Sequence, residues 1–419
     1  IEQAIKSGLG LNATINNKSI FDRKNYFYAD LPQGYQISQF KDPIVGEGAV
    51  EIDIDGKKKI IGIERLHLEQ DAGKSLHDQD PNMTFVDLNR SGIALMEIVS
   101  KPDMASPEEA IAYVRKVRTI LRYLDTCDGN MEQGSLRADV NISVRKEGDE
   151  LGTRCEIKNL NSFKHIGLAI NFEVDRQIKV IENGDKVKQE TRLYDVAVDK
   201  TRSMRSKEDA HDYRYFPDPD LLPLNLNQDW IDEIKKTLPE LPDTKKTRFI
   251  NDYKISEYDA DVLTQDKSIS EYFEDVATNR SIKLSVSWVA SELFAVLNKL
   301  NLTIDKSPIN SKQLGSLIDE IENGTISNRA AKEVFEEMVT SEKSVKDIIN
   351  DKGLVQISDT TEIEKFIDQV LIDNPDNVQK YKDGKTKLLG FFIGEVMKVT
   401  KGKANPGLLN QLVKKKLDN

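Results

Sequence analysis

SLRADVNISVRKEGDELGTRCEIKNLNSF, residues 135–163, is the stretch that decides the fold of the first half of the chain. Along residues 135–144, apolar residues alternate strictly with polar ones. Because successive side chains of a strand point to opposite faces, this alternation predicts a strand with one apolar and one polar face. Residues 154–158 repeat the pattern after a polar link that contains glycine. The two segments therefore predict a pair of strands in an antiparallel sheet.

The predicted polar face of this strand pair carries charges of both signs. The side chains expected on it are Arg137, Asp139, Asn141, Arg145, Arg154, Glu156 and Lys158. Cations on such a face suit phosphate, and carboxylates suit a divalent metal. An ordinary antiparallel sheet with one solvated face shows the same alternation, and the pattern by itself favours this plainer interpretation.

A second group of candidate ligands lies upstream. The residues expected on one face of the strand that runs through residues 60–71 are Arg65, His67, Glu69 and Asp71. Glu97 lies within a short apolar run, residues 95–99, where an unpaired carboxylate costs several kcal/mol if it is buried. Glu69 and Glu97 are therefore candidate ligands of Mg²⁺. A salt bridge or an edge-strand position is the alternative for Glu97.

The order of the remaining elements predicts an α+β fold. Asp55-Gly56 between alternating runs predicts a hairpin of uncertain loop length, and residues 107–124 have helical spacing behind a capping Ser106. Five prolines punctuate residues 213–242, and apolar stripes at helical spacing follow. We therefore expect a sheet-based domain over residues 1–240, and helical domains over residues 241–353 and 354–419.

Composition limits the class of protein. The 419 residues are 38% hydrophobic and 31% charged, which is typical of soluble globular proteins, and no run is apolar and long enough to span a membrane. The two cysteines exclude a disulfide framework and a four-cysteine zinc site, so we expect a cytoplasmic protein. The net charge is −11, yet residues 371–419 carry +5. A basic tail suits contact with a nucleic-acid backbone, and a solubilising terminus explains the charge equally well.

Several motifs together resemble one family. They are FDRKNYFY (21–28), GYQISQ (34–39), LHLEQDAGK (66–74), MEQGSLR (131–137), EIKNLNS (156–162) and DYRYFP (212–217). These motifs resemble the GatB family of tRNA-dependent amidotransferases. The ending KGKANP (401–406) is similar to the YqeY-type tail of that family. The resemblance covers essentially the whole chain.

This resemblance implies a fold, a reaction and partners. It implies a catalytic cradle on an antiparallel sheet, similar in fold to glutamine synthetase, followed by helical and YqeY-like domains that hold tRNA. It implies that ATP and Mg²⁺ serve to phosphorylate the side-chain carboxylate of Glu-tRNA(Gln), Asp-tRNA(Asn) or both. Ammonia from the amidase subunit GatA then displaces the phosphate, and GatC completes a heterotrimer.

The resemblance also implies roles for single residues. Glu69 and Glu97 would ligate Mg²⁺, and Arg137 and Lys158 would contact phosphate. Asp139, Asn141 and Glu156 would complete the catalytic face. The residues expected along the ammonia channel are Lys24 and Gln70, and those expected to bind tRNA are Lys398, Lys401 and Lys403.

The chain departs from the family in two places that bear on activity. A Gly-Leu-Glu-x-His segment that supplies metal ligands in the family does not precede the first motif, so we expect the metal site of this chain to be incomplete. Gln70 stands where many members have Glu, which argues against gating of the channel by ionisation there. Two alternatives stay open: a tRNA-docking scaffold without catalysis, and a free-standing ligase that acts on small molecules.

Overall fold

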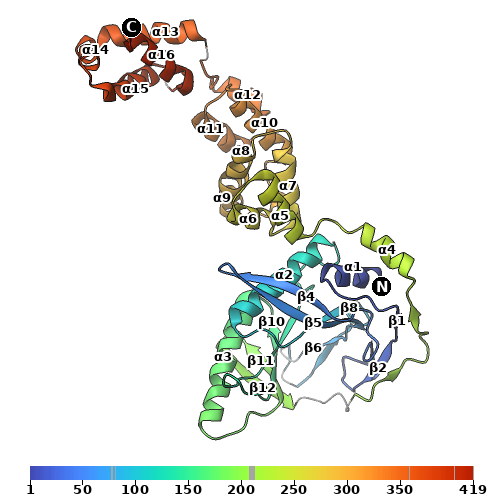
Figure 1. Ribbon diagram of the computed structural model, residues 1–419. Helices are drawn as coiled ribbons and strands as arrows, with labels where there is room; N and C mark the ends of the chain where they lie inside the picture. The colour runs from blue at the N-terminus through green and yellow to red at the C-terminus, as the bar shows by residue number, and fades with distance from the viewer. Residues whose placement is uncertain (77–78, 81, 207–212, 358, 401, 419) are drawn as a thin grey trace. The chain divides into compact units, whose positions relative to one another are not determined.

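The computed structural model describes residues 1–76, 79–80, 82–206, 213–357, 359–400 and 402–418. It divides the chain into two compact units, Ile1–Lys245 and Lys246–Asn419. The first unit holds the sheets and the second is helical, as the predicted order of elements requires (Figure 1). The expected boundaries after residues 240 and 353 stay predictions.

The first unit contains fourteen strands and four helices among its described residues. The helices are α1 (Glu2–Gly10), α2 (Pro107–Tyr123), α3 (Phe163–Glu182) and α4 (Gln228–Lys236). The longer strands are β2 (Asp22–Asn25), β3 (Tyr35–Ser38), β4 (Gly48–Ile54), β5 (Lys57–Gln70), β8 (Ala94–Ser100), β9 (Ala138–Ile142), β10 (Cys155–Leu160), β11 (Glu190–Asp195) and β12 (Lys200–Ser206). The short ones are β1 (Lys18–Ser19), β6 (Lys74–Leu76), β7 (Phe85–Asp87), β13 (Phe216–Pro217) and β14 (Leu224–Asn225).

Helix α2 joins two hydrophobic cores of this unit. It begins as expected, because Ser106 accepts a hydrogen bond from the Glu109 N–H and Pro107 takes the first position. Its residues Val117 and Ile120 pack into a core with α1, β4 and β5. On another side, Ile111 packs against the core between α3 and the β9–β10 strands. The helix therefore fixes two sheets relative to one another.

The first of these sheets has the strand order β4-β5-β8 and is antiparallel throughout. Asp55 and Gly56 both have positive φ, so they form a two-residue turn that pairs Ile54 with Lys57. The lysines after the turn belong to β5, which settles the loop length that the sequence left open. Strand β5 continues without a break in assignment to Gln70, opposite β8.

The second sheet, in the order β12-β11-β10-β9, corrects two expectations. Strand β9 begins at Ala138, because residues 131–134 form a turn, so Arg137 precedes the strand instead of lying within it. The sheet is mixed: β9 and β10 are antiparallel as predicted, but β10 and β11 are parallel. Helix α3 supplies the crossover that a parallel pair needs.

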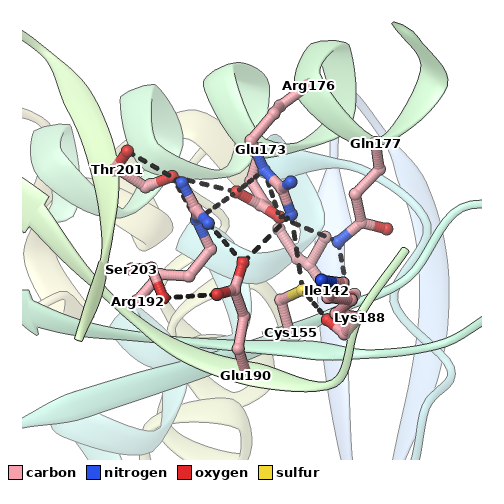
Figure 2. Close-up of polar contacts among 10 residues, drawn as sticks. All are labelled: Ile142, Cys155, Glu173, Arg176, Gln177, Lys188, Glu190, Arg192, Thr201 and Ser203. Carbon is pink, nitrogen blue, oxygen red and sulfur yellow. Dashed lines mark hydrogen bonds and ion pairs between the residues drawn. The ribbon is translucent and has the colours of Figure 1, made fainter. Parts of the chain in front are cut away.

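Helix α3 is fastened to the back of this sheet by a buried polar cluster around Glu173 (Figure 2). Its Oε1 lies 2.6 Å from Nη2 of Arg176, and its Oε2 accepts a hydrogen bond of 3.0 Å from Thr201 on β12. Arg192 on β11 lies 3.3 Å from the same Oε2. Gln177 donates both to Glu173 and to the carbonyl of Ile142 on β9. One fully buried carboxylate thus joins α3 to both ends of the sheet.

The second unit is built from helices α6 (Glu257–Thr264), α7 (Lys267–Ala277), α8 (Ile282–Ser287), α9 (Phe294–Leu300), α10 (Ser311–Glu322), α11 (Asn328–Met338), α12 (Val345–Asp351), α13 (Thr360–Asp373), α14 (Pro375–Lys382), α15 (Leu389–Val399) and α16 (Pro406–Asp418). Helix α5 (Pro242–Tyr253) contains the boundary between the units, a π-helical turn spans Trp288–Leu293, and 3-10 turns lie at Ile304–Lys306 and Thr386–Leu388. Residues 249–349 share one hydrophobic core, and residues 363–417 share another.

The predicted apolar stripes of this unit pack into these cores. Leu314 and Leu317 of α10 are fully buried, and so are Phe392 and Val396 of α15. Val399 is an exception, because it lies at the end of α15 and is half exposed. Among the described residues, none of the helices is both long and apolar enough to cross a lipid bilayer.

Candidate functional site

Three potential metal ligands converge where β5 pairs with β8. His67 and Glu69 lie on the same face of β5, and Glu97 is the register partner of His67 on β8. His67 Nε2 lies 3.7 Å from Glu69 Oε2 and 3.6 Å from Glu97 Oε2. One ligand atom from each residue lies within 4.8 Å of the others. Residues two apart on one strand and a partner on the next thus form a single cluster.

Glu69 is the most constrained member of the cluster. Its Oε2 is buried and has no hydrogen-bond partner among the described residues, since His67 at 3.7 Å is beyond hydrogen-bond length. Burial by itself raises the pKa of the Glu69 carboxyl, but nearby basic side chains outweigh burial and hold the pKa below its usual range. These side chains are His67, Lys24 and Arg137. A buried, ionised oxygen without a partner fits a divalent cation.

Glu97 differs from the expectation in its burial. The apolar run around it suggested a buried carboxylate, but its side chain is 49% exposed. The reason is alternation: Glu97 points to the face that carries His67, whereas Ile98 and Met96 pack toward the core. Its nearness to His67 thus follows from register and not from enforced pairing in the core.

The chemistry of the three donors suits a divalent metal in general. Two carboxylate oxygens are the ligands that Mg²⁺ prefers, while an imidazole nitrogen is equally at home on transition metals. Sequence reasoning placed His67 on this face but gave it no ligand role. The signal was available in the i, i+2 spacing of His67 and Glu69.

Arg137 is held beside this cluster by Asp71, which follows the end of β5. Its Nη2 lies 2.9 Å from Asp71 Oδ2, and the Asp71 side chain is only 11% exposed. The guanidinium itself is about half exposed, at 53%, which leaves further N–H groups toward solvent. Sequence reasoning missed the role of Asp71, because the contact joins residues far apart in the chain.

Lys158 connects the second sheet to the same region. Its Nζ lies 2.5 Å from Asp139 Oδ2 on β9 and 3.7 Å from Glu156 Oε1 on β10. Burial lowers the pKa of Lys158, but Asp139, Glu156 and the more distant Glu97 together raise it above its usual value. The lysine is therefore charged and faces the carboxylates of both sheets.

The remaining residues of the predicted catalytic face lie where the alternation placed them. Asn141 is exposed on β9 and is the register partner of Glu156. Glu156 accepts a 2.9 Å hydrogen bond from the buried hydroxyl of Thr191, its register partner on β11. Thr191 was missed, because the parallel pairing of β10 with β11 was not foreseen.

The two predicted channel residues lie near Glu69 in different ways. Lys24 on β2 acts electrostatically on Glu69, and its Nζ lies 5.0 Å from the centre of the Tyr213 ring. Gln70 Oε1 accepts hydrogen bonds from Gln33 Nε2 at 2.6 Å and from the Ile37 N–H at 2.9 Å. Gln70 is thus fastened to β3 and its flanking loop.

The predicted tRNA-binding lysines lie in the second unit, apart from these residues in sequence. Lys398 is 77% exposed at the end of α15, with Glu395 at 3.7 Å. Lys403 is half-buried beside the start of α16. Lys401 lies outside the described residues.

Comparisons with known proteins place this arrangement in a family. Residues 1–232 match the GatB/GatE catalytic domain, and residues 271–417 match the GatB_Yqey domain, described as the GatB domain. The chain is 58% identical over 422 residues to the second, or B-type, polypeptide of the aspartyl/glutamyl-tRNA(Asn/Gln) amidotransferase of Pelagibacter ubique. That alignment covers 100% of this chain and 86% of the relative. The protein of the same name from Granulibacter bethesdensis is also 58% identical, with the same coverage.

Proposed function

The chain belongs to the GatB family of amidotransferase components, and from this premise we propose how its residues carry out an ATP-dependent reaction. It acts as the GatB component of a tRNA-dependent amidotransferase, a carbon–nitrogen ligase. In our proposal, the polar site phosphorylates the side-chain carboxylate of Glu-tRNA(Gln), Asp-tRNA(Asn) or both. Ammonia from an amidase subunit, GatA, then displaces the phosphate, and GatC completes the heterotrimer.

The buried, unpartnered Oε2 of Glu69 carries this proposal. A carboxylate held ionised in that position needs a cation, and His67 and Glu97 lie close enough to share it. Mg²⁺ bound there would neutralise charge on the phosphates of ATP. Phosphoryl transfer depends chiefly on positioning and charge neutralisation, so these residues supply what the step requires.

The cations on the facing strands have a complementary task. Arg137 presents free N–H groups toward solvent beside the Glu69 cluster, and Lys158 stays charged among three carboxylates. Both suit the equatorial oxygens of a phosphoryl group in transit. Asp139 and Glu156 hold the Lys158 ammonium in place, and Asn141 lies next to them. Transfer makes the new acyl–oxygen–phosphorus bond while ADP leaves.

Lys24 and Gln70 fit a path for ammonia toward this site. Lys24 approaches Glu69 from β2, and Gln70 is the neighbour of Glu69 on β5. Because Gln70 is neutral and doubly hydrogen-bonded through Oε1, it would line the path without titrating. The basic residues Lys398, Lys401 and Lys403 would contact the tRNA backbone. The two free thiols fit the proposed location in a reducing cytoplasm.

The proposal is tested with the full-length protein in complex with its amidase and small subunits. We expect ATP hydrolysis to require Glu-tRNA(Gln) or Asp-tRNA(Asn), and Glu69→Gln to lower that rate by at least about 100-fold because one ligand loses its charge. Glu51→Gln, on the exposed side of β4, is the matched control and should retain full activity.

Two results would overturn the proposal. Hydrolysis by Glu69→Gln at the wild-type rate would leave only a tRNA-docking role for the chain. Turnover with free glutamate or aspartate, and without tRNA, would instead indicate a small-molecule ligase.

A further inference from the structure

Asp71 binds two arginines at once, and only one of them belongs to the catalytic face described above. Its Oδ2 lies 2.9 Å from Arg137 Nη2 and 2.9 Å from Arg90 Nε. Arg90 comes from the segment between β7 and β8, whereas Arg137 precedes β9. One carboxylate oxygen thus brings two guanidinium groups from separate segments side by side.

The burial of the three side chains differs in a way that points to a ligand. The Asp71 side chain is 11% exposed, while Arg90 is 43% and Arg137 is 53% exposed. Each arginine gives Asp71 one nitrogen and keeps the rest of its fork for other acceptors. The trio carries a net charge of +1, with the negative charge inside and the positive charges toward solvent.

The segment that carries Arg90 is also fixed through its backbone. The Asp71 N–H donates to the Ile93 carbonyl at 2.7 Å, and the Gly92 N–H donates to the Asp71 carbonyl at 2.9 Å. The Ile93 N–H closes the turn on the Arg90 carbonyl at 3.1 Å. Arg90 is therefore preorganised and loses little freedom when it binds an anion.

We propose that Arg90 is a second phosphate-binding arginine, paired with Arg137 through Asp71, and that the two hold the terminal phosphoryl group of ATP. This inference rests on the proposed function. Two guanidinium forks side by side match the three equatorial oxygens of a phosphoryl group in transfer. Asp71 touches no substrate in this scheme and is a positioning residue.

Nucleotide binding to the intact heterotrimer tests the proposal by calorimetry with Mg²⁺. We expect Arg90→Ala to weaken ATP binding about tenfold and ADP binding less than twofold, because ADP lacks the group that Arg90 holds. Arg90→Lys should fall between, since lysine keeps the charge and loses the fork. The control Lys57→Ala removes an exposed charge at the β4–β5 turn and should bind ATP normally.

Asp71→Asn separates positioning from a general loss of structure. The uncharged amide keeps an acceptor but no longer draws both arginines together. We expect kcat to fall about tenfold or more while the Kd for ATP does not rise. A merely structural role would raise the Kd and lower the melting temperature together.

The outcomes distinguish the two levels of the argument. Wild-type complex that does not bind ATP would overturn both the proposed function and this inference. Wild-type binding with an unchanged ATP Kd in Arg90→Ala, or with ATP and ADP weakened equally, would overturn only the role of Arg90.

Discussion

At the scale of single residues, the site depends on charges that are held where water would normally solvate them. Glu69 stays ionised in spite of burial because His67, Lys24 and Arg137 surround it. Glu97 is more exposed and relies on His67 as its neighbour across the strands. The cluster is therefore most sensitive to changes of charge at constant shape.

Glu97→Gln should weaken the use of Mg²⁺ without destroying the fold. The amide keeps the shape of the side chain but loses the negative charge that attracts the cation. We expect the Mg²⁺ concentration for half-maximal tRNA-dependent ATP hydrolysis to rise by at least about tenfold. An unchanged Mg²⁺ midpoint would show that Glu97 is not a ligand.

Gln70 permits a prediction that separates charge from hydrogen bonding. Its Oε1 accepts from Gln33 and from the Ile37 N–H, and a carboxylate oxygen accepts both bonds equally well. Gln70→Glu should therefore unfold in urea within about 1 kcal/mol of the wild type, whereas Gln70→Leu should lose about 1–3 kcal/mol. Equal losses in both variants would contradict this account of Gln70.

At the scale of elements, the hairpin β4–β5 depends on its turn. Gly56 has a φ of +79°, a conformation that costs an L-residue about 1 kcal/mol. Gly56→Ala should destabilise the first unit by about that amount in denaturant unfolding. Gly394→Ala is the control: it lies within α15 with open space around it, so the same change should stabilise the second unit by about 0.5–1 kcal/mol.

The Glu173 cluster predicts acid sensitivity of the first unit. Burial raises the pKa of Glu173, but bonds from Arg176, Gln177 and Thr201 outweigh it and hold the pKa below the value of 4.5 for the free side chain. A lowered pKa in the folded state contributes stability above about pH 4.5, and this contribution is lost as the pH falls through the folded-state pKa.

Glu173→Gln tests this directly. At neutral pH the variant leaves Arg192 and Arg176 without their carboxylate, so we expect a loss of about 3 kcal/mol in the free energy of unfolding. The difference from wild type should shrink below pH 4.5, where the wild-type carboxyl takes up a proton. A difference that is constant from about pH 7 to about pH 3 would contradict the role of the ionised carboxylate.

At the scale of the whole molecule, the segment from α13 to α16 has a hydrophobic core of its own. Removal of residues 354–419 should therefore leave the melting temperature of the remaining protein within about 2 °C, because the core of residues 249–349 is not opened. It should also weaken tRNA binding and flatten its dependence on salt, since basic residues leave with the segment. Binding of tRNA with an unchanged salt slope would remove the tail from the interface.

Local patterns predicted much of this fold, and long-range pairing limited the rest. The alternation along residues 135–163 gave the faces of β9 and β10, and Ser106-Pro107 gave the start of α2. The parallel pairing of β10 with β11 was not predictable, because α3 and its crossover separate the two strands. The partner of each strand depends on packing that no local pattern contains.

The candidate site shows the same division. Glu69 and Glu97 were chosen from their strands, and register brings them together with His67. Asp71, Arg90 and Thr191 were missed as site residues, because each acts through a contact with a distant segment. The exposure of Glu97 was also mistaken, since an apolar run does not say which face of a strand a carboxylate takes.

The central claim is that the Glu69 cluster supports transfer of a phosphoryl group from ATP to the carboxylate of aminoacyl-tRNA. Rapid-quench trapping with hydroxylamine, using γ-labelled ATP and the intact complex without an amide donor, measures this step directly. We predict trapped, activated Glu-tRNA or Asp-tRNA with the wild type and at least about 100-fold slower formation with Glu69→Gln. Equal rates of formation in the two proteins, or release of labelled phosphate from the wild type without any activated aminoacyl-tRNA, would contradict the claim.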